Sequence, residues 1–475
     1  MTRAGQRRTA LLAVLGALAA ATGFVPAAAG AQARGGGSGP TVARDIPKIA
    51  FEKYTLPNGL EVILHEDHSV PVVAVNTWYH VGSGDEQRGR TGFAHLFEHI
   101  MFMGSQHVPQ GAFDQWLEAA GGNNNGSTTE DRTNYYEWMP ANALPLALWL
   151  DADRMGFLLP TMDSAKVDLQ RDVVKNERRE RVDNVPYGRA DEIIGAALFP
   201  PNHPYSWPVI GSMADLSAAS VEDVKNFFRT YYAPNNATLV VAGDFQPADA
   251  KRLIERYFGA IPRGTQAITR PAIPDVRLAR DTFLVLEDRV QLPRVFYTWH
   301  TVRIFHPDDA VLDVLAYVLA GDKNSRLYKK LVYDLQVAQD VNAGQRSLHL
   351  DGFFQVDVTP KPGQSPAKID SLARAEIEKV ITGGITQREL ERAQNTIRAQ
   401  ALDRIASVLG KSQQLNFYNY FAGTPDYVQQ DDARYSAVTA ADVQRVAREY
   451  LGAHKVVLTV VPTGKKDMMV TGGAQ

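Results

Sequence analysis

The chain has 475 residues, of which 45% are hydrophobic and 22% charged, an ordinary globular composition that is long enough for about two to four domains. The formal net charge of −3 provides no basic field, so we expect no nucleic-acid partner. The chain contains no cysteine, which excludes disulfides, thiolate metal ligands and cysteine catalysis.

Residues 1–33 have the three-part pattern of a secretory signal peptide. Three arginines precede an apolar run over residues 10–25, and Ala31-Gln32-Ala33 offers a small-residue cleavage site. The run is too short for an ordinary membrane helix, although an uncleaved N-terminal anchor is the alternative interpretation. We expect a secreted protein, periplasmic or alternatively extracellular, with a flexible leader at residues 34–46 and no transmembrane helix in the mature chain.

An alternating apolar pattern at residues 54–64, with Asn58-Gly59 between its two arms, predicts a β-hairpin. Helical patterns follow without regular βαβ alternation. The sequence therefore predicts an α+β fold of two homologous domains, each a mostly antiparallel sheet with helices packed on it.

The motif His95-Leu96-Phe97-Glu98-His99 places two imidazoles and a carboxylate within five residues. In a helix, His95 and His99 lie on one face and can bind the same metal ion, and neutral imidazole is a standard zinc ligand. Glu98 lies close enough to accept a proton from a water molecule rather than to bind the metal. This order is the H-x-x-E-H signature of the inverzincins.

Two later segments add to this picture. Residues 121–126 read Gly-Gly-Asn-Asn-Asn-Gly, which indicates a turn or the irregular start of a strand. Residues 169–181 lack glycine and proline and carry Leu169, Val173 and Val174 at helical spacing, which predicts an amphipathic helix.

That helix offers Glu177 or Glu180 as a third zinc ligand, and helical spacing alone does not separate them. The alternative interpretation is that both pair with neighbouring arginines on a solvated face.

The mature chain contains an internal repeat. Residues 62–67 with Thr77-Trp78 recur as residues 284–288 with Thr298-Trp299, an offset of 221 between the two Trp residues. A second match, from 221–224 to 440–443, has an offset of 219. Shifted by 221, the motif becomes Ala316, Leu319 and Ala320, which cannot bind zinc. We therefore predict an N-terminal zinc-bearing domain at 47–262, a proline-rich linker at 263–274, an inactive C-terminal repeat at 275–465 and a tail at 466–475.

Residues 92–105, which contain the motif, follow Val81-Gly82-Ser83-Gly84-Asp85-Glu86 and resemble the pitrilysin/insulinase family of zinc metallopeptidases, which includes the β subunit of mitochondrial processing peptidase. The similarity covers about residues 50 to 460. Further matching motifs are at 121–128, 133–136, 203–205 and 232–237.

The resemblance implies that the third ligand is Glu177, which follows His99 by 78 residues. It also implies that residues 123–133 include the edge strand beside the zinc, to which a peptide substrate adds as an extra strand. Asn125 and Gly126 are the candidate substrate-binding residues, since glycine allows the close approach of two backbones.

Two features of the resembled family are missing. The outer-shell carboxylate that precedes the third ligand by seven residues is replaced by Gln170. An Arg and Tyr pair that completes the substrate cradle is replaced by Val332 and Gln339. The residues considered as substitutes are Arg326, Tyr328 and Tyr333.

We therefore expect a zinc metalloendopeptidase that holds one zinc ion on His95, His99 and Glu177 and uses Glu98 as the proton acceptor. Its expected substrates are peptides or unfolded polypeptides. A second two-domain chain of the same family is expected to close a chamber over the site, preferably as a heterodimer and alternatively as a homodimer. The competing hypothesis is a non-catalytic chamber or docking subunit that keeps zinc for structure.

Overall fold

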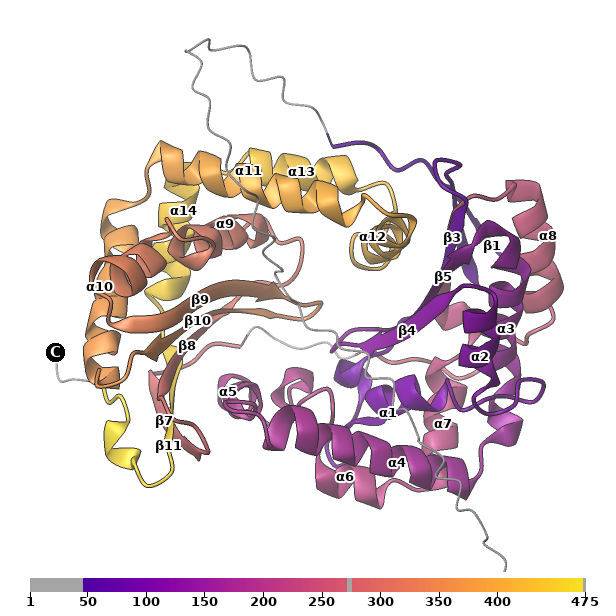
Figure 1. Cartoon of the computed structure of the whole chain (residues 1–475), viewed down its shortest axis with the longest axis horizontal. Helices are drawn as coiled ribbons and strands as arrows, with labels where there is room; N and C mark the ends of the chain where they lie inside the picture. The colour runs from indigo at the N-terminus through magenta and orange to yellow at the C-terminus, as the bar shows by residue number, and fades with distance from the viewer. Residues whose placement is uncertain (1–45, 271–275, 473–475) are drawn as a thin grey trace, which may run out of the picture. The chain divides into compact units, whose positions relative to one another are not determined.

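The computed structural model describes residues 46–270 and 276–472 (Figure 1). The predicted signal peptide, nearly all of the predicted leader and the last residues of the predicted linker and tail lie outside the described residues. We call residues 46–270 the first half and residues 276–472 the second half.

The first half forms a six-stranded sheet in the order β1-β2-β6-β3-β5-β4. Its strands are β1 (Glu52–Thr55), β2 (Glu61–Glu66), β3 (Val72–Tyr79), β4 (Asn123–Thr128), β5 (Thr133–Pro140) and β6 (Ala237–Gly243). The second half forms a five-stranded sheet in the order β7-β11-β8-β10-β9. Its strands are β7 (Thr282–Asp288), β8 (Arg294–Thr301), β9 (Ala338–Ser347), β10 (Gly352–Pro360) and β11 (Lys455–Pro462).

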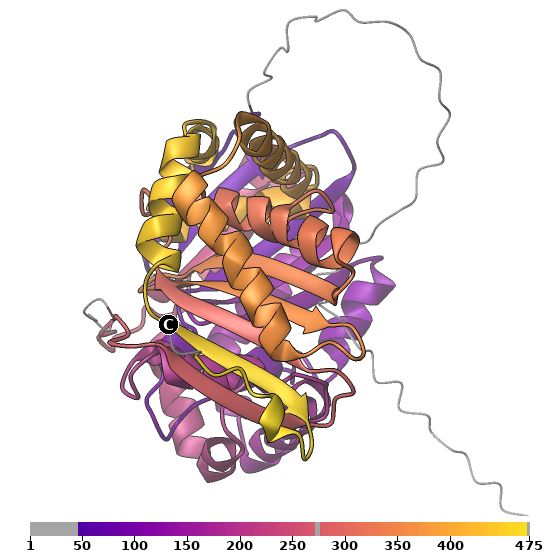
Figure 2. The ribbon, with the colours of Figure 1, turned by 90° about the vertical axis from the view of Figure 1, so that its left-hand side faces the viewer.

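The predicted internal repeat is confirmed, because the two sheets have the same topology. Without β1, the strands of the first sheet follow the order of the second one by one. Each sheet has one parallel pair, β2 with β6 and β7 with β11, and its other pairs are antiparallel. Figure 2 shows β11, drawn in yellow, among the strands of the second half.

Helices pack on both sheets, as the predicted α+β fold requires. The helices of the first half are α1 (Phe93–Ile100), α2 (Ala112–Ala119), α3 (Leu144–Phe157), α4 (Ser164–Arg178), α5 (Ala190–Leu198), α6 (Met213–Ala218), α7 (Val221–Tyr231) and α8 (Pro247–Phe258). Those of the second half are α9 (Asp309–Ala320), α10 (Pro366–Gly383), α11 (Gln387–Arg404), α12 (Val408–Phe421), α13 (Val428–Ser436) and α14 (Ala440–Val446). Within the described residues, no helix is both long enough and apolar enough to span a membrane.

The predicted hairpin at residues 54–64 is confirmed by the antiparallel pairing of β1 with β2. Gly59 adopts a φ of +93° in the turn, a conformation that side chains with a Cβ rarely adopt. The Asn58 side chain donates hydrogen bonds to the carbonyl oxygens of Phe258 and Ile261, so the turn is also fixed to the end of α8.

The predicted helix at residues 169–181 exists, but of its three predicted apolar residues only Val174 is buried. Leu169 and Val173 are exposed, and α4 instead buries Val167, Gln170, Val174 and Arg178. These four residues form one stripe because they recur at spacings of three and four, whereas Leu169 and Val173 lie on the opposite side. The helix then continues into a wider, π-helical turn, η4 (Arg179–Asp183).

Helix α12 belongs to the second half but packs on the first sheet. The buried side-chain amide of Asn416 donates to the carbonyl oxygen of Asn76 on β3. The amide of Asn419 donates to Glu61 Oε2 at 2.8 Å and accepts from Lys53 Nζ at 2.7 Å. Directional polar contacts of this kind fix the register of α12 on the sheet.

We predict that Asn419→Ala lowers the free energy of unfolding by about 1–3 kcal/mol, because it removes three side-chain hydrogen bonds, with Lys53, Glu61 and Thr238, at a buried position. Urea denaturation of the purified protein measures the change. The matched control is Asn395→Ala on the exposed face of α11. Equal stability of the two variants would contradict the prediction.

Candidate metal centre

Helix α1 presents the predicted motif as its polar face. Its apolar residues pack inward, and His95, Glu98 and His99 remain on the partly exposed side. The helix begins at Gly92, where φ is +89° and a Cβ would lie 2.8 Å from the carbonyl oxygen of Ile210. The buried carboxylate of Glu86 accepts hydrogen bonds from the backbone N–H groups of Gly92 and Ala94, and so supplies the cap for the first turn.

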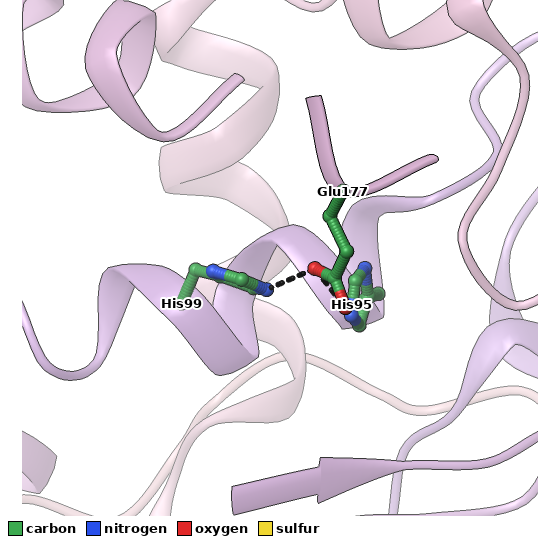
Figure 3. Close-up of side chains that lie close together, drawn as sticks. All are labelled: His95, His99 and Glu177. Atoms are coloured by element: carbon green, nitrogen blue, oxygen red, sulfur yellow. Dashed lines mark ion pairs between the residues drawn. The ribbon is translucent and has the colours of Figure 1, made fainter. Parts of the chain in front are cut away.

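Helix α4 brings Glu177 to the two imidazoles (Figure 3). Glu177 Oε2 lies 3.1 Å from His99 Nε2 and 3.7 Å from His95 Nε2. One ligand atom from each of the three residues lies within 4.8 Å of the others. Glu180, the alternative third ligand, lies on the exposed side of η4 and is not part of this group.

The donor atoms of this group fit a divalent cation. Burial lowers the pKa of His95 to about 4, so its imidazole is neutral at physiological pH and offers a lone pair. Burial alone would raise the pKa of Glu177, but the two imidazoles and Arg181 bring it down to about 2, so the carboxylate is ionised. His95 Nδ1 and Glu177 Oε2 are buried without hydrogen-bond partners. Two imidazoles and one carboxylate form a ligand set of catalytic zinc sites.

Glu98 stays outside the group of three and faces strand β4. Its Oε2 accepts a hydrogen bond of 2.6 Å from Thr128 Oγ1. Burial raises the pKa of Glu98, and the Thr128 hydrogen bond acts in the opposite direction. The carboxylate thus lies beside the three donors and keeps the capacity to accept a proton.

Strand β4, the predicted edge strand, forms the outer edge of the first sheet. Thr129 N donates to Arg132 O, so Thr129 and Arg132 are a hydrogen-bonded pair. Hydrogen-bonded and non-hydrogen-bonded pairs alternate along an antiparallel ladder. Gly126 is three residues before Thr129, so its pair with Tyr135 is a non-hydrogen-bonded one. The N–H and C=O of Gly126 therefore point to the free edge. The N–H donates there to the side chain of Asn125, at 2.8 Å from its Oδ1.

Gly126 also lies against the base of the Glu98 side chain. A Cβ at this position would lie 3.0 Å from Glu98 Cγ and 3.3 Å from Phe102. A glycine here therefore lets the edge strand approach α1 closely.

The substituted family positions have other contacts or lie on other elements. Gln170 is on the buried face of α4, where its amide nitrogen lies 2.7 Å from Met103 Sδ. In the second half, Val332 lies in η7 (Tyr328–Asp334) and Gln339 on β9. Arg326, one of the possible substitutes, is engaged in a two-pronged ion pair with Glu389, at 2.7 and 2.9 Å.

The other two possible substitutes differ in exposure. Tyr328 packs against the second core, whereas Tyr333 is 72% exposed and is free of that core. Exposure alone does not assign Tyr333 a role.

Two residues that shape the site were not singled out from the sequence. Glu86 belongs to one of the matching motifs, but its capping role depends on a chain reversal between Glu86 and Gly92. Thr128 lies in the predicted edge strand, but its contact with Glu98 depends on how β4 meets α1. A period-two argument from Gly126 would have placed Thr128 on the same face of the strand.

The fold and the group of three donors define a class, the two-domain peptidase-like proteins in which one domain carries a possible metal site. Residues 61–199 match the family model for insulinase (peptidase family M16), and residues 218–397 match the model for the peptidase M16 inactive domain. The chain belongs to the insulinase, or M16, family of peptidases.

Curated relatives carry corresponding names. The chain is 30% identical over 412 residues to zinc protease PqqE of Helicobacter pylori, covering 85% of this chain and 90% of the relative. It is 28% identical over 423 residues to an uncharacterized zinc protease of Mycobacterium leprae, covering 87% of this chain and 92% of the relative.

Solved structures show the same fold. A crystal structure of a protease from Helicobacter pylori matches with a TM-score of 0.82 and 27% identity, covering 87% of this chain and all of that one. A peptidase M16 inactive domain from Pseudomonas fluorescens matches with a TM-score of 0.77 and 18% identity, covering 87% of this chain and 98% of that one.

Proposed function

We propose that this protein is a zinc-dependent endopeptidase of the HxxEH type that cleaves short or unfolded polypeptides. The observation that carries the proposal is the grouping of ligand atoms from His95, His99 and Glu177 within 4.8 Å, beside the carboxylate of Glu98. The names of the relatives, which are zinc proteases, support the same activity.

In the proposed reaction, His95, His99 and Glu177 hold one zinc ion, which would act as a Lewis acid toward water and the scissile carbonyl group. Glu98 accepts the proton of the attacking water and then donates it to the nitrogen of the leaving amine. The two transfers restore the ionised carboxylate, so Glu98 is regenerated in each turnover.

We propose that the substrate peptide pairs with the free edge of β4. The N–H and C=O of Gly126 point to this edge, where they can form main-chain hydrogen bonds with an added strand. An incoming peptide carbonyl would replace Asn125 Oδ1 as the acceptor of the Gly126 N–H. Asn125 and Gly126 are therefore the proposed substrate-binding residues.

We further propose that the second half is a structural repeat and that the active unit contains two chains. The domain boundaries proposed are those predicted from the sequence, with the linker at residues 263–274. The residues at the positions of the missing Arg and Tyr pair, Val332 and Gln339, cannot orient a substrate carbonyl by charge. A second two-domain chain that supplies such groups would complete a chamber, most simply as a heterodimer, with a homodimer as the alternative.

The competing function, a non-catalytic chamber subunit that binds zinc for structure, is favoured by the same missing pair and by Gln170. The Glu98 carboxylate lies beside the donors without being one of them, which favours the enzyme, since a structural zinc site would close its fourth position with a protein ligand.

The signal-peptide pattern at residues 1–33 supports export of the protein, and we propose that it is located in the periplasm.

We predict that the purified mature chain alone cleaves an unfolded peptide slowly, and that a partner chain of the same family raises the rate by about tenfold or more, because it adds the missing orienting groups. Peptide hydrolysis is measured with and without a chelator, alongside mass in solution. A zinc-loaded monomer that is equally fast alone would contradict the two-chain proposal. A zinc-loaded protein that is inactive with every partner would support the structural alternative.

A further inference from the structure

The carboxylate of Glu98 is held by one side chain from another element. Thr128 Oγ1 donates to Glu98 Oε2 at 2.6 Å. Among the residues that the structure describes, no other hydrogen bond reaches this carboxylate. Since a hydroxyl has a single proton, the Thr128 proton is committed to this contact.

The strand geometry explains why Thr128 reaches Glu98. Side chains two residues apart point to the same face of a strand, and a Cβ built at Gly126 would meet Glu98 Cγ at 3.0 Å. The Thr128 side chain therefore points to the same face of β4 as a Cβ at Gly126 would, which is the face that meets Glu98. Gly126 makes room for the stem of Glu98, and Thr128 holds the carboxylate at its end.

The hydroxyl of Thr128 is itself fixed by its surroundings. Thr128 is directly opposite Thr133 on β5, and Thr133 Oγ1 lies 3.5 Å from Thr128 Oγ1 while it donates to the carbonyl oxygen of Val81 at 2.9 Å. Thr133 is fully buried. A β-branched side chain in a strand also has few χ1 rotamers, so the donor has little freedom.

We propose that Thr128 is a positioning residue that fixes the Glu98 carboxylate by one oxygen and leaves Oε1 as the oxygen that accepts and returns the proton. This inference rests on the proposed peptidase function. The Thr128 proton stays on Oγ1 throughout, so the residue takes no part in the proton balance. Because a peptide pairs with the outer edge of the same strand, β4 would set the position of the substrate and of the base together.

The test compares Thr128→Val with Thr128→Ser. Valine keeps the shape and the strand preference but removes the donor, whereas serine keeps the donor. We expect Thr128→Val to lower kcat by about 10- to 100-fold, the size of a lost hydrogen bond to a charged group, with KM unchanged. Thr128→Ser is expected to retain most of the wild-type kcat.

Two measurements separate positioning from a structural role. The zinc content of each variant and the affinity of its zinc-free form for the peptide, by fluorescence anisotropy, are expected to equal those of the wild type. A matched control is Ser347→Ala, which removes a hydroxyl from the corresponding end of edge strand β9 in the second half, 219 residues later. Its kcat is expected to be unchanged.

The outcomes are distinct. A Thr128→Val enzyme with wild-type kcat would overturn the inference and leave the peptidase function standing. Equal losses in the valine and serine variants, or a fall in zinc content or peptide affinity, would replace positioning with a structural role. A wild-type protein that binds zinc but cleaves no peptide, alone or with a partner, would reject both the inference and the proposed function.

Discussion

Glu98→Gln is expected to keep its zinc and to lose peptide hydrolysis by roughly 10²- to 10⁴-fold, the usual contribution of a general base. The amide has nearly the shape of the carboxylate, and its oxygen can still accept the hydrogen bond from Thr128. It cannot take up a proton from water. Single-turnover hydrolysis of a fluorogenic peptide measures the loss, and elemental analysis measures the zinc.

The matched control for this variant is Glu180→Gln, which makes the same chemical change at an exposed carboxylate outside the donor group. It is expected to cleave at the wild-type rate. Turnover of Glu98→Gln near the wild-type rate would remove Glu98 from its proposed role, whatever its zinc content.

Glu177→Ala is expected to reduce bound zinc far below one ion per chain, whereas Glu180→Ala retains it. Glu177 Oε2 lies within 4 Å of both imidazoles, and its removal leaves two neutral donors without the anionic one. The affinity loss should exceed the roughly 10- to 100-fold that removal of an outer-shell partner costs.

Elemental analysis after dialysis against a zinc buffer checks this prediction. Arg181, which pairs with Glu177 Oε1, provides a further comparison, because Arg181→Gln leaves all three donors in place and is expected to retain zinc. Equal zinc content in Glu177→Ala and Glu180→Ala would contradict the assignment of the third ligand.

Much of the fold could be predicted from the sequence, because these parts of it are encoded in short sequence patterns. The Asn58-Gly59 hairpin depends on turn chemistry within a few residues. The two matching offsets predicted a duplication, which the shared strand order confirms. The packing of α12 on the first sheet could not be predicted, since it joins residues more than 300 positions apart.

At the candidate site, helical periodicity could not decide between the two possible third ligands. Glu177 and Glu180 are three residues apart and both follow the helical pattern, so the orientation of α4 about its axis decides between them. That orientation follows from the stripe of Val167, Gln170 and Val174, which lies closer around the helix to Glu177 than to Glu180. The sequence pattern predicts Leu169, Val173 and Val174 as the apolar face, which is right for Val174 and wrong for the other two, and only the family resemblance separates the two glutamates.

The packing of α12 on the first sheet has a consequence for truncation of the chain. The second half carries no metal ligands at the positions that correspond to the motif, but its helix α12 covers Ala74 and Ala242 of the first sheet through Val408. Deleting the second half would expose this apolar surface to water and remove the side chains that bind Asn76 on β3. A fragment ending near residue 262 is therefore expected to aggregate instead of folding.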